Sequence, residues 1–279
     1  MSNTAIILFD ISSVAGLVLL TAVFLTAWGS SGAARTPTWF TFIGSLIVLS
    51  GTNILIMGEQ TGPEPTKWAC FLQAVLIYPE VVFNAHAGAA LLVQVYLSML
   101  SIERSRILPR KYVTWLVVCP IASTFAILVL STVMAAINPS VVRRDISGMR
   151  CHLEQVPQIV FYTSVAVGIL GVAIIFVFEV LVISKFLRNR QALKEGMIQG
   201  RTAPAMILRL TLFNVLIFIV VIISVFVFKD AEASLAANNL AMATLPLGGA
   251  IIFGTQKDIL GVWASLLAIK SRSKVASPV

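Results

Sequence analysis

The sequence predicts an all-α integral membrane protein, a bundle of seven transmembrane helices followed by a short helix on the membrane surface. The first observation is composition, since 58% of the residues are hydrophobic and 11% are charged, whereas a soluble domain is about one quarter charged. The second is that apolar runs of about 20 residues, the length that crosses a bilayer, recur along the whole chain. The third is that basic residues gather between these runs. We therefore expect one transmembrane domain over 1–279.

The expected spans differ in how uniformly apolar they are. The sixth is the most uniform, whereas the seventh contains Asn238, Asn239 and Pro246. The third is too long for a straight crossing, so we expect a kink at Pro79 or helix ends that project from the membrane. The first lacks the basic start of a signal peptide and is interpreted as a span. In order, the spans are expected at 6–28, 38–57, 70–102, 112–137, 158–184, 206–228 and 237–256.

The distribution of basic residues predicts the orientation of the bundle. Short segments rich in Lys and Arg face the cytoplasm. With seven alternating spans, all but five of the 20 basic residues fall on the side of the C-terminus, which places the N-terminus outside. The net charge of +8 could also suggest nucleic acid, but the charges form no continuous basic face, so no nucleic-acid partner is expected. The five exceptions are Lys67, Arg143, Arg144, Arg150 and Lys229.

The three cysteines fall in different places of this topology. Cys70 lies at the outer end of the third span and Cys151 in the outer loop 138–157, so both face the oxidising side, where a disulfide is chemically allowed. The alternative is two free extracellular thiols, but an exposed unpaired thiol is reactive, so we favour the disulfide. Cys119 lies in the apolar middle of the fourth span and is interpreted as a small packing residue.

Together these features resemble a G-protein-coupled receptor. The resemblance rests on seven spans with the N-terminus outside, on the positions of Cys70 and Cys151, and on Glu103-Arg104 at the inner end of the third span. The phrase IIFGTQKDILGVW, the short tail and the long third span are more similar to the compact fungal receptors than to the large animal family. The resemblance implies an extracellular ligand, a heterotrimeric G protein on the cytoplasmic side and the plasma membrane as location.

Polar residues of the third span share one face. At 100° per residue, six of them fall within a stripe about 100° wide, which should face the bundle rather than lipid. One interpretation is a hydrogen-bonded seam that only holds helices together. The other places the outer members in a ligand pocket, together with Asn238 and Asn239 of the seventh span, which are chosen by their depth in the membrane. The stripe consists of Gln73, Glu80, Asn84, Gln94, Ser98 and Ser101. The pocket candidates in it are Gln73, Glu80 and Asn84. The three residues nearer the inner end, Gln94, Ser98 and Ser101, are expected in the seam.

Two other carboxylates lie in the apolar runs. Asp10 is near the outer end of the first span and is within reach of lipid headgroups. Glu179 lies about two turns from the inner end of the fifth span, where it could extend towards Lys185 or Arg188. A functional role is the alternative, because ionisable groups at membrane depth are costly.

Several enzyme classes do not fit the sequence. His86 and His152 are the only histidines, so a multi-histidine metal site is excluded and no metal or other cofactor is expected. The motifs of serine hydrolases, P-loop proteins and zinc proteases are absent from the sequence. The seventh span contains no lysine, so a retinal Schiff base is not available there. We therefore expect a protein that is not an enzyme.

The stretch SMLSIERSRILPRK over 98–111 ends the third span with clustered charge. The basic residues anchor the span at the cytoplasmic face, and this interpretation is favoured over a switch role for Arg104. The basic segment 185–205 is expected to extend the fifth helix, and it either meets the G protein or attracts anionic lipid. The receptor resemblance implies a G-protein face that includes Glu103, Arg104, Arg188 and Arg209.

A short amphipathic helix is expected after the last span. Over 257–270 the larger apolar residues, including Trp263, fall on one side, which suits a helix lying on the inner leaflet. The leading hypothesis is thus a receptor. A small secondary carrier is the alternative, although its expected corresponding breaks in two halves are not evident. A regulatory membrane protein without a ligand is the third possibility.

Overall fold

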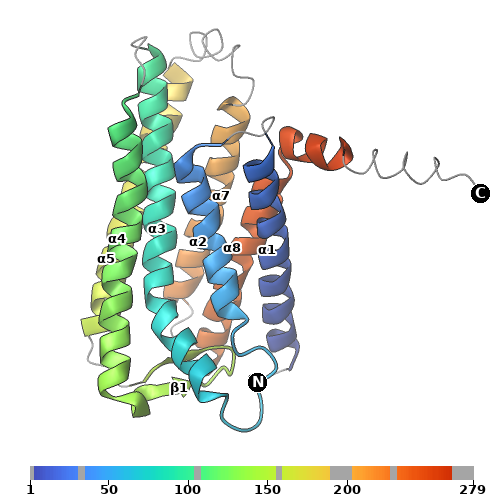
Figure 1. Cartoon of the computed structure of the whole chain (residues 1–279), viewed down its shortest axis with the longest axis vertical. Coiled ribbons are helices and arrows are strands. Elements are labelled where there is room, and N and C mark those ends of the chain that lie inside the picture. The colour runs from blue at the N-terminus through green and yellow to red at the C-terminus, as the bar shows by residue number, and fades with distance from the viewer. Residues whose placement is uncertain are drawn as a thin grey trace, which may run out of the picture.

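The computed structural model describes residues 3–30, 35–103, 108–154, 159–188, 203–226 and 231–265. Within these ranges the protein is an all-α bundle of long helices that run side by side, with one small hairpin at one end (Figure 1). A short helix over 257–265 follows the last long helix. In chain order the elements are α1 (Asn3–Gly29), α2 (Pro37–Asn53), α3 (Lys67–Glu103), α4 (Arg110–Ile137), η2 (Pro139–Val141), β1 (Val142–Arg144), β2 (Cys151–Leu153), α5 (Ile159–Arg188), α7 (Ala203–Phe226) and α8 (Ala231–Gly254).

Five helices in these ranges are long and apolar enough to cross a membrane, namely α1, α3, α4, α5 and the Leu235–Gly254 part of α8. Their outward faces carry exposed large apolar side chains, for example Phe125 of α4 and Leu170 of α5, which suits contact with lipid. α2 has 17 residues, and α7 contains the apolar stretch Met206–Val220. The architecture is that of an all-α, multi-pass membrane protein, as the composition predicted.

The helix bounds differ from the expected spans at informative places. α3 runs through Pro79 without ending and has 37 residues. α2 ends at Asn53, four residues before the expected end, because the chain turns there and Gly58 takes a φ of +85°. The expected surface helix is present over 257–265, where it leaves the bundle nearly across its axis (Figure 1). Residues 189–202 and 266–270 lie outside the described residues, and so do the expected continuations of α5 and of the surface helix.

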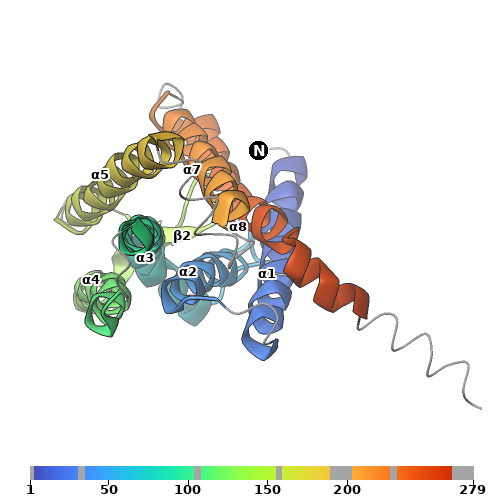
Figure 2. The ribbon, with the colours of Figure 1, turned by 90° about the horizontal axis from the view of Figure 1, so that it is seen from above.

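Viewed along the bundle, α3 lies between α2, α4 and α5 (Figure 2). The largest buried cluster joins α1, α2, α3, α5, α7 and α8. At its centre the ring of Phe42 lies 5.2 Å from that of Phe213 and 5.6 Å from that of Phe253, centroid to centroid. All three side chains are buried. This edge-to-face contact of aromatic rings fixes α2, α7 and α8 against one another.

Two glycines allow helices to approach closely. A Cβ on Gly16 of α1 would lie 2.9 Å from Cβ of Pro246 in α8. A Cβ on Gly171 of α5 would lie 2.6 Å from Cδ2 of His86 in α3. Small residues at helix crossings are the usual device for close packing in membranes, where no hydrophobic effect drives helices together.

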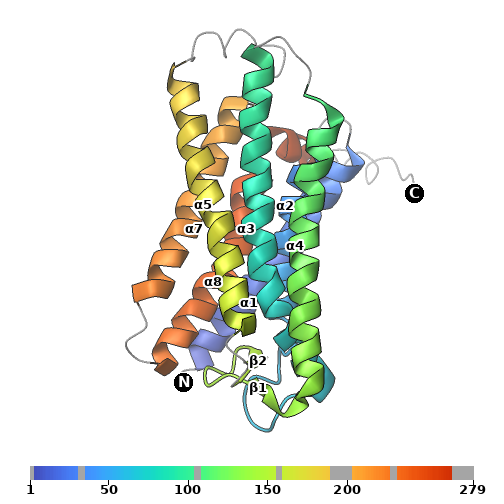
Figure 3. The same ribbon diagram turned by 90° about the vertical axis from the view of Figure 1, so that its left-hand side faces the viewer.

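The hairpin of β1 and β2 covers one end of the bundle, here called the hairpin end. Val142 pairs with Leu153 and Arg144 with Cys151 in antiparallel register. A disulfide joins Cys151 to Cys70 of α3, the pair favoured from the sequence, and Cys119 is free and exposed. The first residues of α1 lie at this same end (Figures 1 and 3), whereas the helix 257–265 marks the opposite end, here called the tail end.

Candidate functional site

The loop between the two strands enters the bundle instead of lying on its surface. The backbone N–H of Asp145 donates to the carbonyl of Arg150 at 2.8 Å, and that of Gly148 donates to the carbonyl of Asp145 at 3.0 Å. Gly148 permits the turn because its φ is +71°. Met149 is fully buried in a cluster with Phe9 of α1 and residues of α8. The loop 145–150 therefore fills the space between helix ends, and we call it the plug loop.

Arg150 is a buried charge of the plug loop, with 7% of the residue exposed. One guanidinium nitrogen lies 3.4 Å from Oε1 of Glu80 in α3, and another donates to Oδ1 of Asn53 at the end of α2. The guanidinium carbon lies 5.8 Å from the centre of the Phe9 ring in α1. A single side chain thus connects the hairpin to three helices. Its Nε has no hydrogen-bond partner among the described residues.

The polar stripe of α3 faces mainly α2. Nε2 of Gln73 donates to the carbonyl of Thr52 at 2.8 Å, and its Oε1 accepts from the N–H of Cys151 at 2.7 Å. Ser45 donates to Oδ1 of Asn84 at 3.0 Å. Gln94 accepts a hydrogen bond from Thr38. This row of contacts runs along the helix pair, so the structure brings these three polar side chains into an interhelical seam.

α8 holds the plug loop from the other side. Nδ2 of Asn239 donates to Oδ2 of Asp145 at 2.8 Å and contacts Oγ of Ser147 at 3.1 Å. The hydroxyl of Ser147 donates to Oδ1 of Asp145 at 2.7 Å. Asp145 and Asn239 are both buried. Hydrogen bonds in such an interior of low dielectric constant are electrostatically stronger than hydrogen bonds in water.

A cavity of about 470 Å³ lies beside the plug loop, between α3, α5 and α8. Its wall is mostly apolar and aromatic, with Tyr78 from α3, Tyr162 from α5 and Met242 from α8. A mostly apolar cavity with a few polar groups is the usual form of a small-molecule site. The polar lining consists of Asp145, Arg150, His152, Ser164, Asn238 and Asn239.

Two of the five pocket residues expected from the sequence, Asn238 and Asn239, line this cavity. Gln73, Glu80 and Asn84 contact α2 or the plug loop instead. His152 also lines the cavity, and its Nδ1 is buried with no partner in the part of the chain that the structure describes. The cavity therefore offers a buried polar atom that a bound molecule could use as a hydrogen-bond partner.

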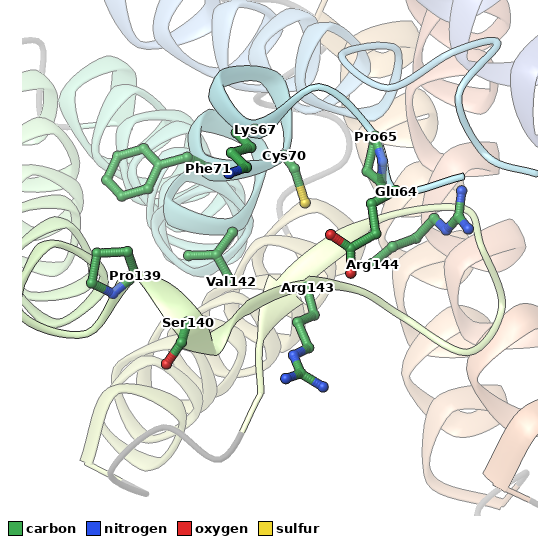
Figure 4. Close-up of a pocket in the computed structure, with 10 residues that line it drawn as sticks. All are labelled: Glu64, Pro65, Lys67, Cys70, Phe71, Pro139, Ser140, Val142, Arg143 and Arg144. Carbon is green, nitrogen blue, oxygen red and sulfur yellow. The ribbon is translucent and has the colours of Figure 1, made fainter. Parts of the chain in front are cut away.

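A second cavity, of about 640 Å³, lies outside the hairpin at the start of α3 (Figure 4). It contains the basic side chains of Lys67, Arg143 and Arg144. Arg144 donates to the carbonyls of Glu59 at 2.7 Å and of Gly62 at 2.8 Å, and Arg143 lies 3.4 Å from a carboxylate oxygen of Glu154. Arg144 thus holds the loop before α3 and Arg143 forms an exposed ion pair at the hairpin, so the cavity is a surface feature rather than a bundle site.

At the tail end, ion pairs and caps connect neighbouring helices. Lys185 of α5 pairs with Glu103 at the end of α3. Arg209 of α7 donates to the carbonyls of Ile252 at 2.6 Å and Thr255 at 2.9 Å. Ile252 belongs to the last turn of α8, where carbonyls lack a backbone donor within the helix, and Thr255 follows directly after the helix. Glu103 and Arg209 of the expected G-protein face therefore each join two helices.

Other tail-end residues have different environments. Arg188 is exposed at the last residue of α5, and Arg104 lies outside the described residues. Arg35, before α2, pairs with Asp258 of the short helix 257–265. Trp263 of that helix donates from Nε1 to the hydroxyl of Thr26 in α1 at 2.7 Å, so the short helix is held by side-chain contacts.

Glu179 lies inside the bundle rather than extending towards Lys185 or Arg188. It is 8% exposed, and its Oε2 accepts a hydrogen bond of 2.6 Å from Asn214 in α7. A partner amide on a neighbouring helix satisfies one carboxylate oxygen without reaching the membrane surface. The sequence position of Asn214 in the most apolar span was the available signal, because a polar residue at that depth needs a partner.

Sequence reasoning missed Arg150 and Asp145 as members of the site. Charge counting treated Arg150 only as one of the basic residues on the outer side. Its position next to Cys151 was the available signal, since a disulfide to α3 brings its neighbour to the head of that helix. Glu80 was a second signal, because a buried carboxylate calls for an opposite charge.

No known family model matches the chain, and no curated protein matches it. Within the described ranges, no group of three or more His, Cys, Asp or Glu residues is placed to hold a metal ion. What the arrangement can do is defined by its own geometry. One end has a tethered loop beside a cavity, and the other end has charged contacts between the same helices.

Proposed function

We propose that the protein is a seven-transmembrane receptor of the G-protein-coupled kind, with the N-terminus outside and the C-terminus in the cytoplasm. An extracellular ligand binds in the cavity beside the plug loop, and a heterotrimeric G protein binds at the tail end. The observation that carries the proposal is the plug loop itself, tied by the Cys70–Cys151 disulfide to α3 and leaving a cavity of about 470 Å³ beside it.

The seven-span count is supported by the course of α2. Its contacts with α3 extend from Thr38, bonded to Gln94, to Thr52, bonded to Gln73. α2 therefore follows α3 along most of its own length, which suits a helix that crosses the same bilayer. At about 1.5 Å per residue its 17 residues span about 25 Å, close to the hydrocarbon thickness of about 30 Å.

The coupling between the two ends follows from shared helices. The cavity wall includes side chains of α3, α5 and α8. At the tail end, Lys185 and Glu103 join α5 to α3, and Arg209 joins α7 to α8. A ligand that binds one arrangement of these helices more tightly shifts the population towards it. The Lys185–Glu103 pair then opens, and the ends of α3 and α5 become accessible to the G protein.

The test is nucleotide exchange on purified G proteins by the receptor in lipid nanodiscs. The protein should accelerate binding of a non-hydrolysable GTP analogue by at least one Gα class in a panel. Lys185→Ala should raise this basal rate, because it removes the pair that holds α3 to α5. Arg188→Glu should lower it, because it reverses an exposed charge at the expected interface. Arg143→Ala, at the hairpin end, is the matched control and should leave the rate unchanged.

A carrier would give a different pattern. It would leave exchange on every Gα class at the rate of empty nanodiscs, and it would dissipate a solute or pH gradient across proteoliposomes. That pair of results would reject the receptor proposal in favour of transport. Absence of both activities would instead favour a regulatory membrane protein without a ligand.

A further inference from the structure

A separate groove opens on the outside of the bundle, between α4 and α5. It has a volume of about 400 Å³, and α3 forms its floor, as the view of α3 between α5 and α4 shows (Figure 3). The floor is low because Ala89 and Ala90 are small. Trp115 and Cys119 of α4 form one wall, and Ile174 of α5 contributes the other.

The groove has the depth of one lipid leaflet. Its lining on α3 extends from His86 to Leu97, twelve residues whose eleven helical steps cover about 16 Å at about 1.5 Å per residue. Half of a hydrocarbon core about 30 Å thick is about 15 Å. The groove therefore begins near the tail-end surface of the membrane and ends near the middle of the bilayer.

His86 lies at the deep end of the groove, and both of its ring nitrogens already have hydrogen-bond partners. Nδ1 lies 2.8 Å from the hydroxyl of Ser123 in α4, and Nε2 lies 3.0 Å from the carbonyl of Val167 in α5. Both ring nitrogens are thus engaged in holding three helices together. The rest of the lining is almost entirely apolar, so the groove suits a hydrocarbon chain.

The shallow end of the groove is positively charged. Tyr112 lines it, and Nζ of Lys111 lies 5.3 Å from the centre of the Tyr112 ring. Lys111 and Arg110 are exposed at the start of α4. A cation beside the mouth of an apolar groove complements the phosphate of a lipid headgroup.

We propose that this groove binds one acyl chain of an anionic phospholipid from the leaflet at the tail end, with the phosphate held by Lys111. The bound chain fills the space between α4 and α5 that protein side chains leave open. Lipid binding at this groove requires only the membrane architecture and the groove itself, so it is expected whether the protein is a receptor or a carrier.

The test is retention of lipid in native mass spectrometry of the full chain. The protein is purified in a mild detergent with equal amounts of phosphatidylglycerol and phosphatidylcholine. Wild-type protein should retain one molecule of phosphatidylglycerol in preference to phosphatidylcholine. Cys119→Trp should abolish this retention by filling the groove. Val118→Trp is the matched control, because Val118 is an exposed neighbour on α4 that does not line the groove.

The headgroup contact is tested by charge. Lys111→Ala should lower the preference for phosphatidylglycerol about fivefold, the effect expected for one basic residue near an anionic surface. Lys257→Ala removes another exposed basic residue at the tail end, one that does not line the groove, and should leave the preference unchanged. Equal retention by the Cys119→Trp and Val118→Trp proteins would overturn the proposal.

A competing occupant gives a distinct outcome. An added sterol could displace phosphatidylglycerol, and retention of the sterol could be the same in wild-type and Lys111→Ala protein. In that case the groove is a sterol site and the proposal fails. A measurement on unaltered protein guards against misfolding of the tryptophan variant. Cys119 is the free thiol of the chain, so its reaction with N-ethylmaleimide should slow when phosphatidylglycerol replaces phosphatidylcholine, and an unchanged rate would count against the proposal.

Discussion

At the scale of single residues, the hairpin end depends on Arg150. Its guanidinium meets a carboxylate from α3, an amide oxygen from α2 and a ring from α1. A planar guanidinium with five donors can satisfy such divergent partners, whereas the single ammonium of lysine cannot. The charge is buried together with that of Glu80, so each member of the pair makes the other tolerable.

We predict that Arg150→Ala lowers the free energy of unfolding by about 3–5 kcal/mol, because it leaves the buried Glu80 carboxyl without its partner. Arg150→Met combined with Glu80→Gln should recover much of this loss, since both charges are then removed. Thermal and denaturant unfolding in detergent of the single and double variants would measure the coupling as a double-mutant cycle.

Arg143→Ala is the control for this prediction. Arg143 pairs with Glu154, but both side chains are largely exposed, at 64% and 45%. Exposed ion pairs contribute about 0–1 kcal/mol, so this variant should unfold like wild type. Equal effects at Arg143 and Arg150 would mean that burial of the Glu80 pair has no energetic consequence.

At the scale of elements, close helix crossings and the tethered hairpin determine the shape of the site. α3 and α5 approach each other at Gly171, where an added Cβ would also lie 2.9 Å from Cβ of Ala85. The two helices carry opposite walls of the cavity through Tyr78 and Tyr162. Any change in their separation is therefore transmitted to the cavity.

Gly171→Val should destabilise the protein by about 1–3 kcal/mol through overpacking against His86 and Ala85. The matched variant is Gly44→Ala in α2, where an added Cβ meets nothing within 4 Å. There the gain in helix propensity should make the variant as stable as wild type or up to about 1 kcal/mol more stable. Melting temperatures in detergent would compare the two, and a tolerated Gly171→Val would argue against a tight α3–α5 crossing.

Removal of the disulfide should release the hairpin. Cys151→Ser is expected to cost about 2–5 kcal/mol, since the bond closes a loop with a sequence separation of 81 residues. Cys119→Ser should have little effect, because that thiol is exposed and unpaired. Limited proteolysis should then cut near Gly148 in the Cys151→Ser protein before it cuts the helices. Cleavage that starts within a helix would show that other contacts hold the plug loop.

Periodicity predicted which face of α3 is buried, because a rigid helix repeats every 100°. Gln73, Glu80 and Gln94 are indeed 0%, 2% and 6% exposed. It could not predict which neighbour they meet, since that depends on how helices distant in sequence pack. The end of α2 was misplaced for a related reason. The sequence remains apolar through Ile54, Leu55 and Ile56, and hydropathy does not distinguish a helix from a turn.

The path of the plug loop lay beyond the sequence patterns. Asn238 and Asn239 were selected by depth and do line the cavity, but Asp145 and Arg150 lie in a polar loop that hydropathy assigns to the surface. Their burial follows from the disulfide at Cys151 and from the turn at Gly148. The disulfide is a long-range constraint and the turn is a local one. Neither produces a periodic pattern of apolar residues in the sequence.

At the scale of the whole molecule, the proposed orientation depends on charge and on the parity of the spans. The loop 54–66 and the hairpin lie together at the hairpin end, where Arg144 contacts the carbonyls of Glu59 and Gly62. The short helix 257–265 lies at the tail end (Figure 1). If α2 and α7 both cross the bilayer, these two ends face opposite compartments, with the hairpin end outside.

Substituted cysteines test this arrangement in a Cys119→Ser background. Glu64 and Lys257 are both exposed, one in the loop before α3 and one at the start of the short helix. A membrane-impermeant maleimide should label Glu64→Cys on intact cells, whereas Lys257→Cys should be labelled only after the membrane is permeabilised. The reverse pattern would invert the orientation inferred from the basic residues. Five helices, α3, α4, α5, α7 and α8, lie between the two positions, and an odd number of crossings puts the positions on opposite sides. If both cysteines were labelled from outside, at least one of these helices would fail to cross the membrane.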